Sequence, residues 1–531
     1  MLFTNSVLFL CLTFFGATKG GVLRNDTFRL DIVHYNDFHA RFEETSITDP
    51  VCKSNDDKCI GGFARLFYEI KHILDSKPDA MLLNAGDDFQ GTYWFTLLKD
   101  KVMSKFINML PNDAHTLGNH EFDDGVAGLV PYLEALRDPV LVANIDTSLE
   151  PTLNGLYKPH VVLERKGRKI AIIGVTTPDT KMLSNPEGVR FLDPAPIVKK
   201  EAQLLTDQGV DIIIVLSHCG LYVDKAMAKT VGENVDIIVG GHTHSLLWNG
   251  TAPSHEVVAG TYPEYEEADN KPGHKVLVVT ASAFSKYLGY IGVDFDGNGD
   301  IVSFEAQPVF LNRSIPEDPE IKEALKPYME KINEIVKEVV GNTSEDLSLN
   351  ACSYGECALG DIIVDSFLDK AKQKNPTNST SFSYIMKKMI RTDIKKGDIT
   401  TGDIMNVQPF ASVIWSYKIQ GKYVKEALEE STRRSDLQAS MPQVAGLKLT
   451  INTTSKEITV LVKKGDEWIP LEDDEEYQFT TPKYIKQQFE PLNANAKDIS
   501  LVGIDFEIVK DYVKKITPIN PLLDGRLTVI S

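Results

Sequence analysis

Over residues 28–311, short apolar runs rich in β-branched residues alternate with segments whose apolar positions recur at helical spacing. Such alternation is typical of buried strands joined by crossover helices, so we expect an α/β layered domain. Polar residues cluster just after each run, at the strand ends where α/β domains usually place their sites. The runs that we predict to be strands are 30–34, 80–84, 169–175, 211–216, 235–239 and 275–280.

A break marked by prolines follows this region. Pro316 and Pro319 precede a stretch of helically spaced apolar residues, and Gly341 comes after it. Proline in the first turn and glycine past the last turn are typical helix ends, so the stretch predicts an amphipathic linker helix. The expected organisation is a first domain at 25–312, the linker helix at 313–341 and a second domain at 342–531.

The second domain mixes both kinds of pattern without an internal repeat. Helices are expected at 359–372 and 421–434, and strands at 446–452, 458–463 and 477–481.

The N-terminal residues have the pattern of a cleavable export signal. An apolar run from Leu2 to Phe15 is too short to span a membrane and ends in the small residues Gly16 and Ala17. We expect residues 1–20 to be removed and the protein to be secreted; the C-terminal residues also lack the hydrophobic tail of a lipid anchor. In an exported protein the Asn-X-Ser/Thr sequons are candidate glycan sites, and they occur at Asn25, Asn249, Asn312, Asn342, Asn378 and Asn452.

Composition and charge narrow the function further. Of the 531 residues, 42% are hydrophobic and 25% are charged, which is typical of a globular protein. The 75 acidic side chains outnumber the 56 basic ones, and no long Lys/Arg-rich run occurs, so a nucleic-acid partner is not expected. An anionic substrate would therefore need a local positive charge, such as a bound metal ion.

Cysteine spacing favours two short disulfides. Outside the export signal, Cys52 lies close to Cys59 and Cys352 lies close to Cys357, as expected in an oxidising compartment. A zinc site is the less favoured alternative, because no Cys-X-X-Cys pair is present. The remaining Cys219 is expected to be a buried small hydrophobic residue.

Metal-ligand residue types follow several of the predicted strands. Asp37 and His39 are two residues apart, as are His242 and His244, so in extended backbone each pair points to one side and can bind one ion. A lone histidine after a strand is usually an ordinary loop residue, but the complete set indicates a metal centre. The set comprises 36–39, 86–88, 118–121 with Asp123, 217–218 and 240–244.

The ligand types also indicate the kind of metal centre. Aspartate, asparagine and histidine without thiolate suit zinc, manganese or magnesium. The candidate ligands are too many for one tetrahedral ion. We therefore predict two divalent ions about 3.5 to 4 Å apart that share a carboxylate.

These motifs resemble those of the calcineurin-like metallophosphoesterases, and within them the 5'-nucleotidase and apyrase group. The resemblance is carried by Asp37-Phe38-His39, Gly86-Asp87, Gly118-Asn119-His120-Glu121, Ser217-His218 and Gly240-Gly241-His242. It implies an α/β fold with an N-terminal four-layer α/β/β/α metallophosphoesterase domain, a linker helix and an α+β C-terminal 5'-nucleotidase domain that binds the nucleotide.

The resemblance also implies the ligand set of each metal ion. By motif position, Asp37 and His39 would hold the first ion, Asp87 would bridge, and Asn119, His218 and His242 would hold the second. His244 is expected near the first ion or the phosphate, and Asp88 and Glu121 are expected to support their neighbours. The two ions, which could be zinc, manganese, magnesium or calcium, would neutralise the phosphate and lower the pKa of a bound water.

His120 is the expected catalytic group outside the ligand set. Oriented by Asp123 three residues on, it would stabilise charge on the transferred phosphoryl group or protonate the leaving oxygen.

The C-terminal domain departs from the family pattern. Ser353 stands where relatives have arginine after the first cysteine of the disulfide loop, and Met386-Lys387-Lys388-Met389-Ile390-Arg391 replaces Asn-Gly-Gly-Gly-Ile-Arg. The glycine-rich segment after the second base-stacking aromatic is also missing, since 486–490 read Lys-Gln-Gln-Phe-Glu. We therefore expect altered base recognition, with Arg391, Phe410, Tyr484 and Glu490 as the remaining substrate-binding residues.

The first hypothesis is a secreted nucleotide phosphohydrolase that removes ATP and ADP. It resembles the salivary apyrases of blood-feeding arthropods, which suppress platelet aggregation in this way. A 5'-nucleotidase acting on AMP and a phosphodiesterase for cyclic or sugar nucleotides share the metal site and are alternatives. A different class is a binding protein that retains the fold and inhibits platelets through an integrin. The candidate motifs for that partner are Lys396-Gly397-Asp398 and Lys464-Gly465-Asp466, although such tripeptides recur by chance.

Overall fold

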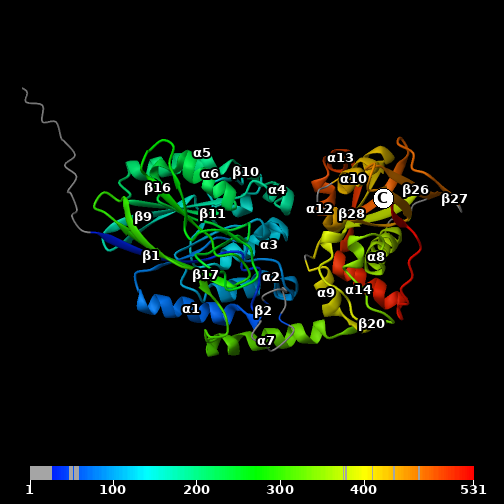
Figure 1. The fold of residues 1–531 in the computed structure, drawn as a ribbon, viewed down its shortest axis with the longest axis horizontal. Coiled ribbons are helices and arrows are strands. Elements are labelled where there is room, and N and C mark those ends of the chain that lie inside the picture. Colours follow the sequence, from blue (N-terminus) through cyan, green and yellow to red (C-terminus); the bar gives the residue numbers. More distant parts are fainter. Residues whose placement is uncertain are drawn as a thin grey trace, which may run out of the picture.

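The computed structural model describes residues 27–46, 52, 59–374, 376, 379–409, 411–433, 437–464 and 467–530. They form two lobes that are joined by helix α7 (Pro319–Val336), which runs along the bottom of Figure 1. The expected export signal at 1–20 and the sequons at Asn25 and Asn378 lie outside the described residues. Among the described helices, none is both long and apolar enough to cross a membrane.

Two sheets form the centre of the N-terminal lobe. One has the strand order β18-β17-β1-β4-β5-β6, with β19 (Val309–Phe310) beside β17, and the other has the order β15-β16-β12-β11-β9-β8. The first consists of β18 (Ile301–Ala306), β17 (Tyr287–Phe295), β1 (Phe28–Tyr35), β4 (Met81–Asn84), β5 (Ala114–Thr116) and β6 (Val140–Leu141). The second consists of β15 (Glu264–Glu267), β16 (Lys275–Val279), β12 (Ile237–Val239), β11 (Ile212–His218), β9 (Arg168–Thr176) and β8 (His160–Arg165).

Helices cover the outer face of each sheet. Apolar side chains from both sheets, such as Ile32 and Ile214, share one buried core. Val33 points to the opposite face, where it packs in a second core with the helices of the first sheet. The outer helices are α1 (Phe63–Ser76), α2 (Tyr93–Ile107) and α3 (Gly125–Ala135) on the first sheet, and α5 (Pro194–Asp207) and α6 (Leu221–Val231) on the second. The lobe is therefore the four-layer α/β/β/α arrangement that the resemblance implied.

Parallel pairing brings the polar strand ends together. Strand β1 is parallel to β4, which is parallel to β5, while β9, β11, β12 and β16 are parallel in the other sheet. All six strands predicted from the apolar runs are present. Because parallel strands end at the same edge of a sheet, their polar loops lie side by side.

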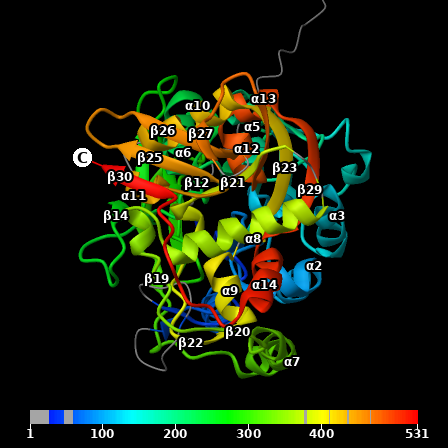
Figure 2. The ribbon, with the colours of Figure 1, turned by 90° about the vertical axis from the view of Figure 1, so that its right-hand side faces the viewer.

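The C-terminal lobe is α+β. A five-stranded sheet has the order β24-β21-β28-β23-β29, and a four-stranded sheet has the order β27-β26-β25-β30. Helix α8 (Ala358–Lys374) lies across the larger sheet in Figure 2, and α10 (Gly421–Arg433) and α14 (Asp505–Ile516) complete the lobe. The strands are β21 (Ser381–Met386), β23 (Val413–Gln420), β24 (Pro442–Ala445), β25 (Leu447–Asn452), β26 (Ile458–Lys464), β27 (Glu467–Pro470), β28 (Glu476–Pro482), β29 (Lys497–Ile504) and β30 (Leu527–Ile530).

The predicted linker helix extends too far at its C-terminal end. Helix α7 ends at Val336, and strand β20 (Val339–Thr343) follows, paired with β22 (Gly397–Thr400). The β-branched pair Val339-Val340 continues the helical apolar spacing, but pairing with β22 satisfies its backbone groups in an extended conformation. Gly341 therefore lies inside a strand rather than past a helix end.

The predicted disulfides are both present. Cys52 is bonded to Cys59 and Cys352 to Cys357, so these four sulfurs are not available for zinc. Cys219 is a free, buried cysteine, as expected.

Candidate active site

The loops after five strands of the two sheets converge at one point. The Asp37 amide donates to the carbonyl of Gly86 at 2.9 Å, and the His39 amide donates to the carbonyl of Asp87 at the same distance, so the first two loops are fastened together. The residues brought together are Asp37 and His39 after β1, Asp87 after β4, Asn119 after β5, His218 at the end of β11, and His242 and His244 after β12.

Three overlapping groups of side chains can hold metal ions, and within each group the candidate ligand atoms lie within 4.8 Å of one another. The groups are Asp37, His39 and His244; His39, Asp87 and His120; and Asp87, His218 and His242. Asp87 joins the second group to the third: its Oδ2 lies 3.1 Å from Nε2 of His218 and 3.8 Å from Nε2 of His39. The arrangement suits two ions with one shared carboxylate.

His244 lies on the side of Asp37. Its Nε2 is 3.2 Å from Asp37 Oδ1 and 3.1 Å from Nε2 of His39. The side chain therefore stands beside the first pair of candidate ligands.

Asn119 provides a direct test of the fit to a metal. Its buried Oδ1 has no hydrogen-bond partner among the described residues. A buried oxygen without a donor is costly unless a cation or water meets it. The donor set of carboxylates, imidazoles and one amide oxygen therefore fits divalent ions such as zinc or manganese.

Hydrogen bonds from neighbouring backbone fix the imidazoles. His39 donates from Nδ1 to the carbonyl of Phe89 at 3.2 Å, and His218 donates from Nδ1 to the carbonyl of Ala85 at 2.6 Å. In both rings this leaves Nε2 as the atom that can bind a metal. Asn36 similarly donates to Asp37 Oδ2 at 2.6 Å and fixes that carboxylate.

Glu121 holds the loop that carries Asp87. Its carboxylate accepts from the amides of Asp87 at 3.0 Å, Asp88 at 2.7 Å, Phe89 at 3.0 Å and Gly118 at 2.6 Å. Asp88 in turn accepts from Asn84 and Tyr132. Glu121 and the Oδ2 atom of Asp88 therefore both accept hydrogen bonds from neighbouring residues.

The backbone of the candidate ligands is strained. Five of them adopt the left-handed region, which non-glycine residues rarely occupy and which is found most often at functional sites. Their φ values are 50° for Asp37, 50° for His39, 58° for Asp87, 79° for His242 and 51° for His244.

The charge states of four candidate ligands also suit metal binding. Burial lowers the pKa of His39 to about 3 and that of His242 to about 4, so both rings are neutral at physiological pH. Burial alone would raise the pKa of Asp37, but the charges of His244 and His218 lower it below the usual value. Burial also acts to raise the pKa of Asp87. The charge of His218, together with those of other histidines, outweighs burial, so the pKa of Asp87 lies well below its usual value.

His120 carries a positive charge at the edge of this cluster. It donates from Nδ1 to Asp123 Oδ2 at 2.7 Å, and the Ser184 hydroxyl donates to the other oxygen of Asp123 at 2.6 Å. Burial opposes protonation, but Asp123 and Asp87 raise the pKa of His120 to about 10. The ring centroid lies 5.2 Å from that of His39, next to the candidate metal ligands.

Known proteins share both lobes of this structure. The calcineurin-like phosphoesterase family model matches residues 30–246, and the model of the 5'-nucleotidase C-terminal domain matches 339–494. An apyrase from Tabanus yao is 37% identical over 523 residues, which cover 95% of this chain and 94% of that protein. The chain belongs to the 5'-nucleotidase and apyrase family.

Other members of the family are similarly close. A snake venom 5'-nucleotidase from Gloydius brevicauda is 34% identical over 526 residues, covering 94% of this chain and 89% of that protein. The crystal structure of a 5'-nucleotidase precursor from Thermus thermophilus superposes with a TM-score of 0.76 at 31% identity, covering 95% of this chain and 99% of that one. As a member of this family the protein is a metal-dependent nucleotide hydrolase, and its calcineurin-like fold implies a site for two divalent ions.

The structure describes three of the four predicted substrate-binding residues of the C-terminal lobe, namely Arg391, Tyr484 and Glu490. Tyr484 lies in helix α12 (Lys483–Gln488), and Glu490 is exposed in the first turn of α13 (Glu490–Asn495). The ammonium group of Lys388 lies 5.6 Å from the centre of the Tyr484 ring and covers part of it. Arg391 is close enough to Arg41 of the other lobe for its charge to lower the pKa of Arg41. Phe410 lies outside the described residues.

Two short helices occupy the segment that lacks the expected glycines. Phe489, between α12 and α13, is fully buried in the core of the C-terminal lobe. A large apolar side chain here anchors the segment, whereas glycine would leave room for a ligand.

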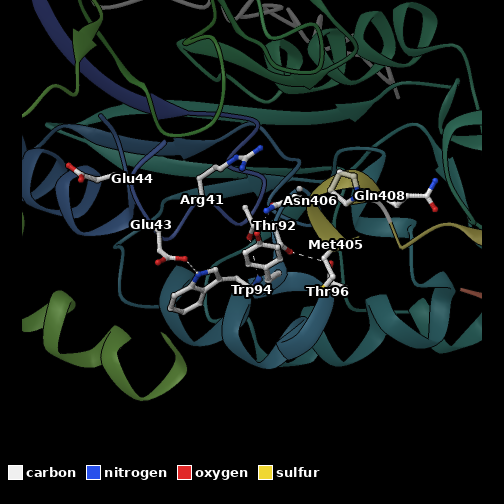
Figure 3. A pocket seen from close by; sticks show the side chains of 12 residues that line it. Arg41, Glu43, Glu44, Thr92, Trp94, Thr96, Met405, Asn406 and Gln408 are labelled. Atoms are coloured by element: carbon white, nitrogen blue, oxygen red, sulfur yellow. Dashed lines mark hydrogen bonds between the residues drawn. The ribbon is translucent and has the colours of Figure 1, made fainter. Parts of the chain in front are cut away.

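A small cavity lies between the lobes (Figure 3). The side chains of Arg41, Thr92 and Trp94 line it from the N-terminal lobe, and Met405 and Asn406 line it from the C-terminal lobe. Its volume is about 50 Å³, far below the roughly 300 Å³ or more of a typical ligand pocket. The cavity is thus too small to be the nucleotide site.

Arg41 lies between this cavity and the candidate metal ligands. Burial and the charge of Arg391 lower its pKa to about 10. Its guanidinium lies 4.7 Å from the centre of the Phe284 ring, which packs against the rings of His39 and His244. Sequence reasoning missed both Arg41 and Phe284. Arg41 could have been identified because it lies only two residues after the candidate ligand His39. Phe284 is far from the ligand motifs in sequence, and only the fold brings it next to His39 and His244.

The first integrin-like tripeptide is not a free loop. Asp398 lies in β22 opposite Asn342 of β20, and Asn342 donates to its Oδ1 at 3.1 Å. The second copy includes Gly465 and Asp466, which lie outside the described residues.

Proposed function

We propose that the protein is a secreted, apyrase-like phosphohydrolase that hydrolyses ATP and ADP at a centre of two divalent ions. The observation that carries this proposal is the position of Asp87, which joins two groups of candidate ligands. In this assignment Asp37 and His39 hold the first ion with His244 nearby, and Asn119, His218 and His242 hold the second.

Each part of the site then has a chemical role. Bound ions would neutralise the phosphate and lower the pKa of the attacking water. His120, which Asp123 keeps protonated and oriented, would stabilise the negative charge that develops on the phosphoryl oxygens. Glu121 and Asn36 would keep the ligand loops in place during the reaction.

The choice of ATP and ADP rests on two kinds of support. Relatives from Tabanus yao, Anopheles gambiae and Aedes aegypti are named apyrases. In this chain, Lys388 lies over Tyr484, and short helices occupy the segment that lacks the expected glycines. These features support the proposal of altered base recognition at a site with added positive charge. Removal of extracellular ATP and ADP would inhibit platelet aggregation, which fits the N-terminal export pattern.

Phosphate release tests this proposal. The purified protein would be assayed with ATP, ADP and AMP in the presence of calcium, magnesium, manganese or zinc, with a chelator control. We expect metal-dependent loss of ATP and ADP that is faster than loss of AMP. Turnover of AMP alone would identify a 5'-nucleotidase, and absence of turnover with any nucleotide would contradict the proposed function.

A further inference from the structure

Lys483 extends from the C-terminal lobe to a residue of the N-terminal lobe. It is the first residue of α12, which faces helix α4 (Thr180–Leu183) across the boundary between the lobes in Figure 1. Its ammonium group donates to Oδ1 of Asn185. Asn185 follows Ser184, whose hydroxyl donates to Asp123. Lys483 is also close enough to Asp123 for the two charges to interact.

A second lysine lies beside it. Lys483 and Lys486 are 5.4 Å and 5.6 Å from the centre of the same Trp415 ring. Lys486 is only 4% exposed, and it donates to Oδ1 of Asn493 at 3.0 Å. The two ammonium groups therefore share one aromatic support at the boundary between the lobes.

Burial makes this pair of charges costly. It lowers the pKa of Lys483, against the opposing influence of Glu187 and Asp123, and it also lowers the pKa of Lys486. Partly desolvated cations bind an anion more strongly than cations in water. The chain has a formal charge of −19, so the two lysines form a local positive site in an acidic protein. They are therefore a candidate binding site for a negatively charged ligand.

The position of the pair indicates which anion it would meet. The metal cluster would take the phosphoryl group that is transferred, and His120 lies at its edge. AMP has no further phosphate, whereas ADP and ATP carry additional charged groups that must lie outside the cluster. Lys483, whose charge interacts with that of Asp123, the partner of His120, is placed to meet the next phosphate of such a chain.

We propose that Lys483, supported by Lys486 and Trp415, binds the second phosphoryl group of nucleoside di- and triphosphates. This inference rests on the proposed function and names the residue that selects the substrate class. Lys483 acts as a specificity residue, because it contacts a phosphate that is not transferred at the metal cluster.

Steady-state kinetics with ADP and AMP tests the proposal. Lys483→Met keeps an unbranched side chain and removes the charge that lies over Trp415. We expect its KM for ADP to rise at least about tenfold more than its KM for AMP, and we expect Lys483→Arg to restore most of the difference. Equal changes for the two substrates, or none, would overturn the proposal.

Asn185→Ala separates anion binding from simple contact between the lobes. This variant removes the partner of Lys483 in the N-terminal lobe but keeps the ammonium group. We expect its ratio of KM for ADP to KM for AMP to stay within about twofold of the wild-type ratio. If Asn185→Ala reproduced the effect of Lys483→Met, Lys483 would act by joining the lobes and the proposal would be wrong.

Binding of inorganic pyrophosphate provides a test that does not depend on turnover. Calorimetry of the metal-loaded protein should show a Kd for pyrophosphate that rises about tenfold or more in Lys483→Met, with a smaller change for phosphate. Thermal unfolding of the variant shows whether it is folded, and Lys483→Arg gives the matched comparison. An unchanged Kd for pyrophosphate would overturn the assignment of Lys483, whereas absence of nucleotide turnover in the wild type would contradict only the proposed function.

Discussion

Nδ1 of His120 lies 2.7 Å from Oδ2 of Asp123, and this pair stands at the edge of the candidate metal cluster. Because Asp123 both orients the ring and raises its pKa, we predict that Asp123→Asn lowers kcat about 10- to 100-fold. The metal content should be unchanged, as measured by elemental analysis. Ser184→Ala, which removes only one hydrogen bond to Asp123, is the milder control. Wild-type kcat in Asp123→Asn would show that the pair has no role in the reaction.

Gly118 makes the close approach of two strand-end loops possible. A Cβ atom at this position would stand 2.1 Å from Oδ1 of Asp87 and 2.6 Å from its amide nitrogen. We therefore predict that Gly118→Ala displaces Asp87, weakens metal binding at least about tenfold and lowers the free energy of unfolding by about 1–3 kcal/mol. Metal titration and thermal unfolding would measure the two effects.

Gly355→Ala is the matched control for this substitution. A Cβ atom there would meet only Val529, at an ordinary contact distance of 3.8 Å. Metal affinity should stay at the wild-type value. Equal losses in the two variants would mean that the approach of Gly118 to Asp87 is not what matters.

Asp236 should make stability depend on pH. Burial raises the pKa of this carboxyl to about 7, although its Oδ2 accepts from the amide of Ile213 at 2.8 Å. Between the unfolded pKa of about 4 and pH 7, the folded chain holds a proton that the unfolded chain has released. The contribution of Asp236 to stability therefore falls as the pH rises through this range.

Asp236→Asn removes this titration. We predict that its free energy of unfolding rises relative to wild type by up to about 1.4 kcal/mol per pH unit between about pH 4 and 7. Denaturant unfolding at several pH values would measure the difference. Substitution of the exposed Asp75 by asparagine is the control. A difference that does not change with pH would show that Asp236 is charged in the folded protein throughout.

The sequence was most informative where the signal is local. Buried strands such as 30–34 are recognisable from their apolar runs, and the polar residues that follow them lie at one sheet edge because the strands are parallel. That is why Asp37 and His218, far apart in the chain, could be expected in one cluster. The ends of elements were less certain, because Val339 fits a helix by its spacing but lies in a strand through its pairing with Thr400.

Contacts between distant segments of the chain could not be predicted in this way. Neither the packing of Arg41 on Phe284 nor the contact of Lys483 with Asn185 leaves a pattern in the sequence, because each depends on how distant segments meet. In the C-terminal lobe the resemblance to the family predicted that the glycine-rich segment is missing. It could not show that the replacement folds into helices anchored by Phe489.

The central claim is that Asp87 is shared by two metal ions that act on a nucleotide. Metal content and phosphate release, measured together on wild type and Asp87→Asn after loading with manganese or zinc, test it most directly. We predict two ions per wild-type chain with nucleotide turnover, and at most one retained ion with at least about a 100-fold loss of turnover in Asp87→Asn. Two tightly bound ions and wild-type turnover in Asp87→Asn would contradict the account.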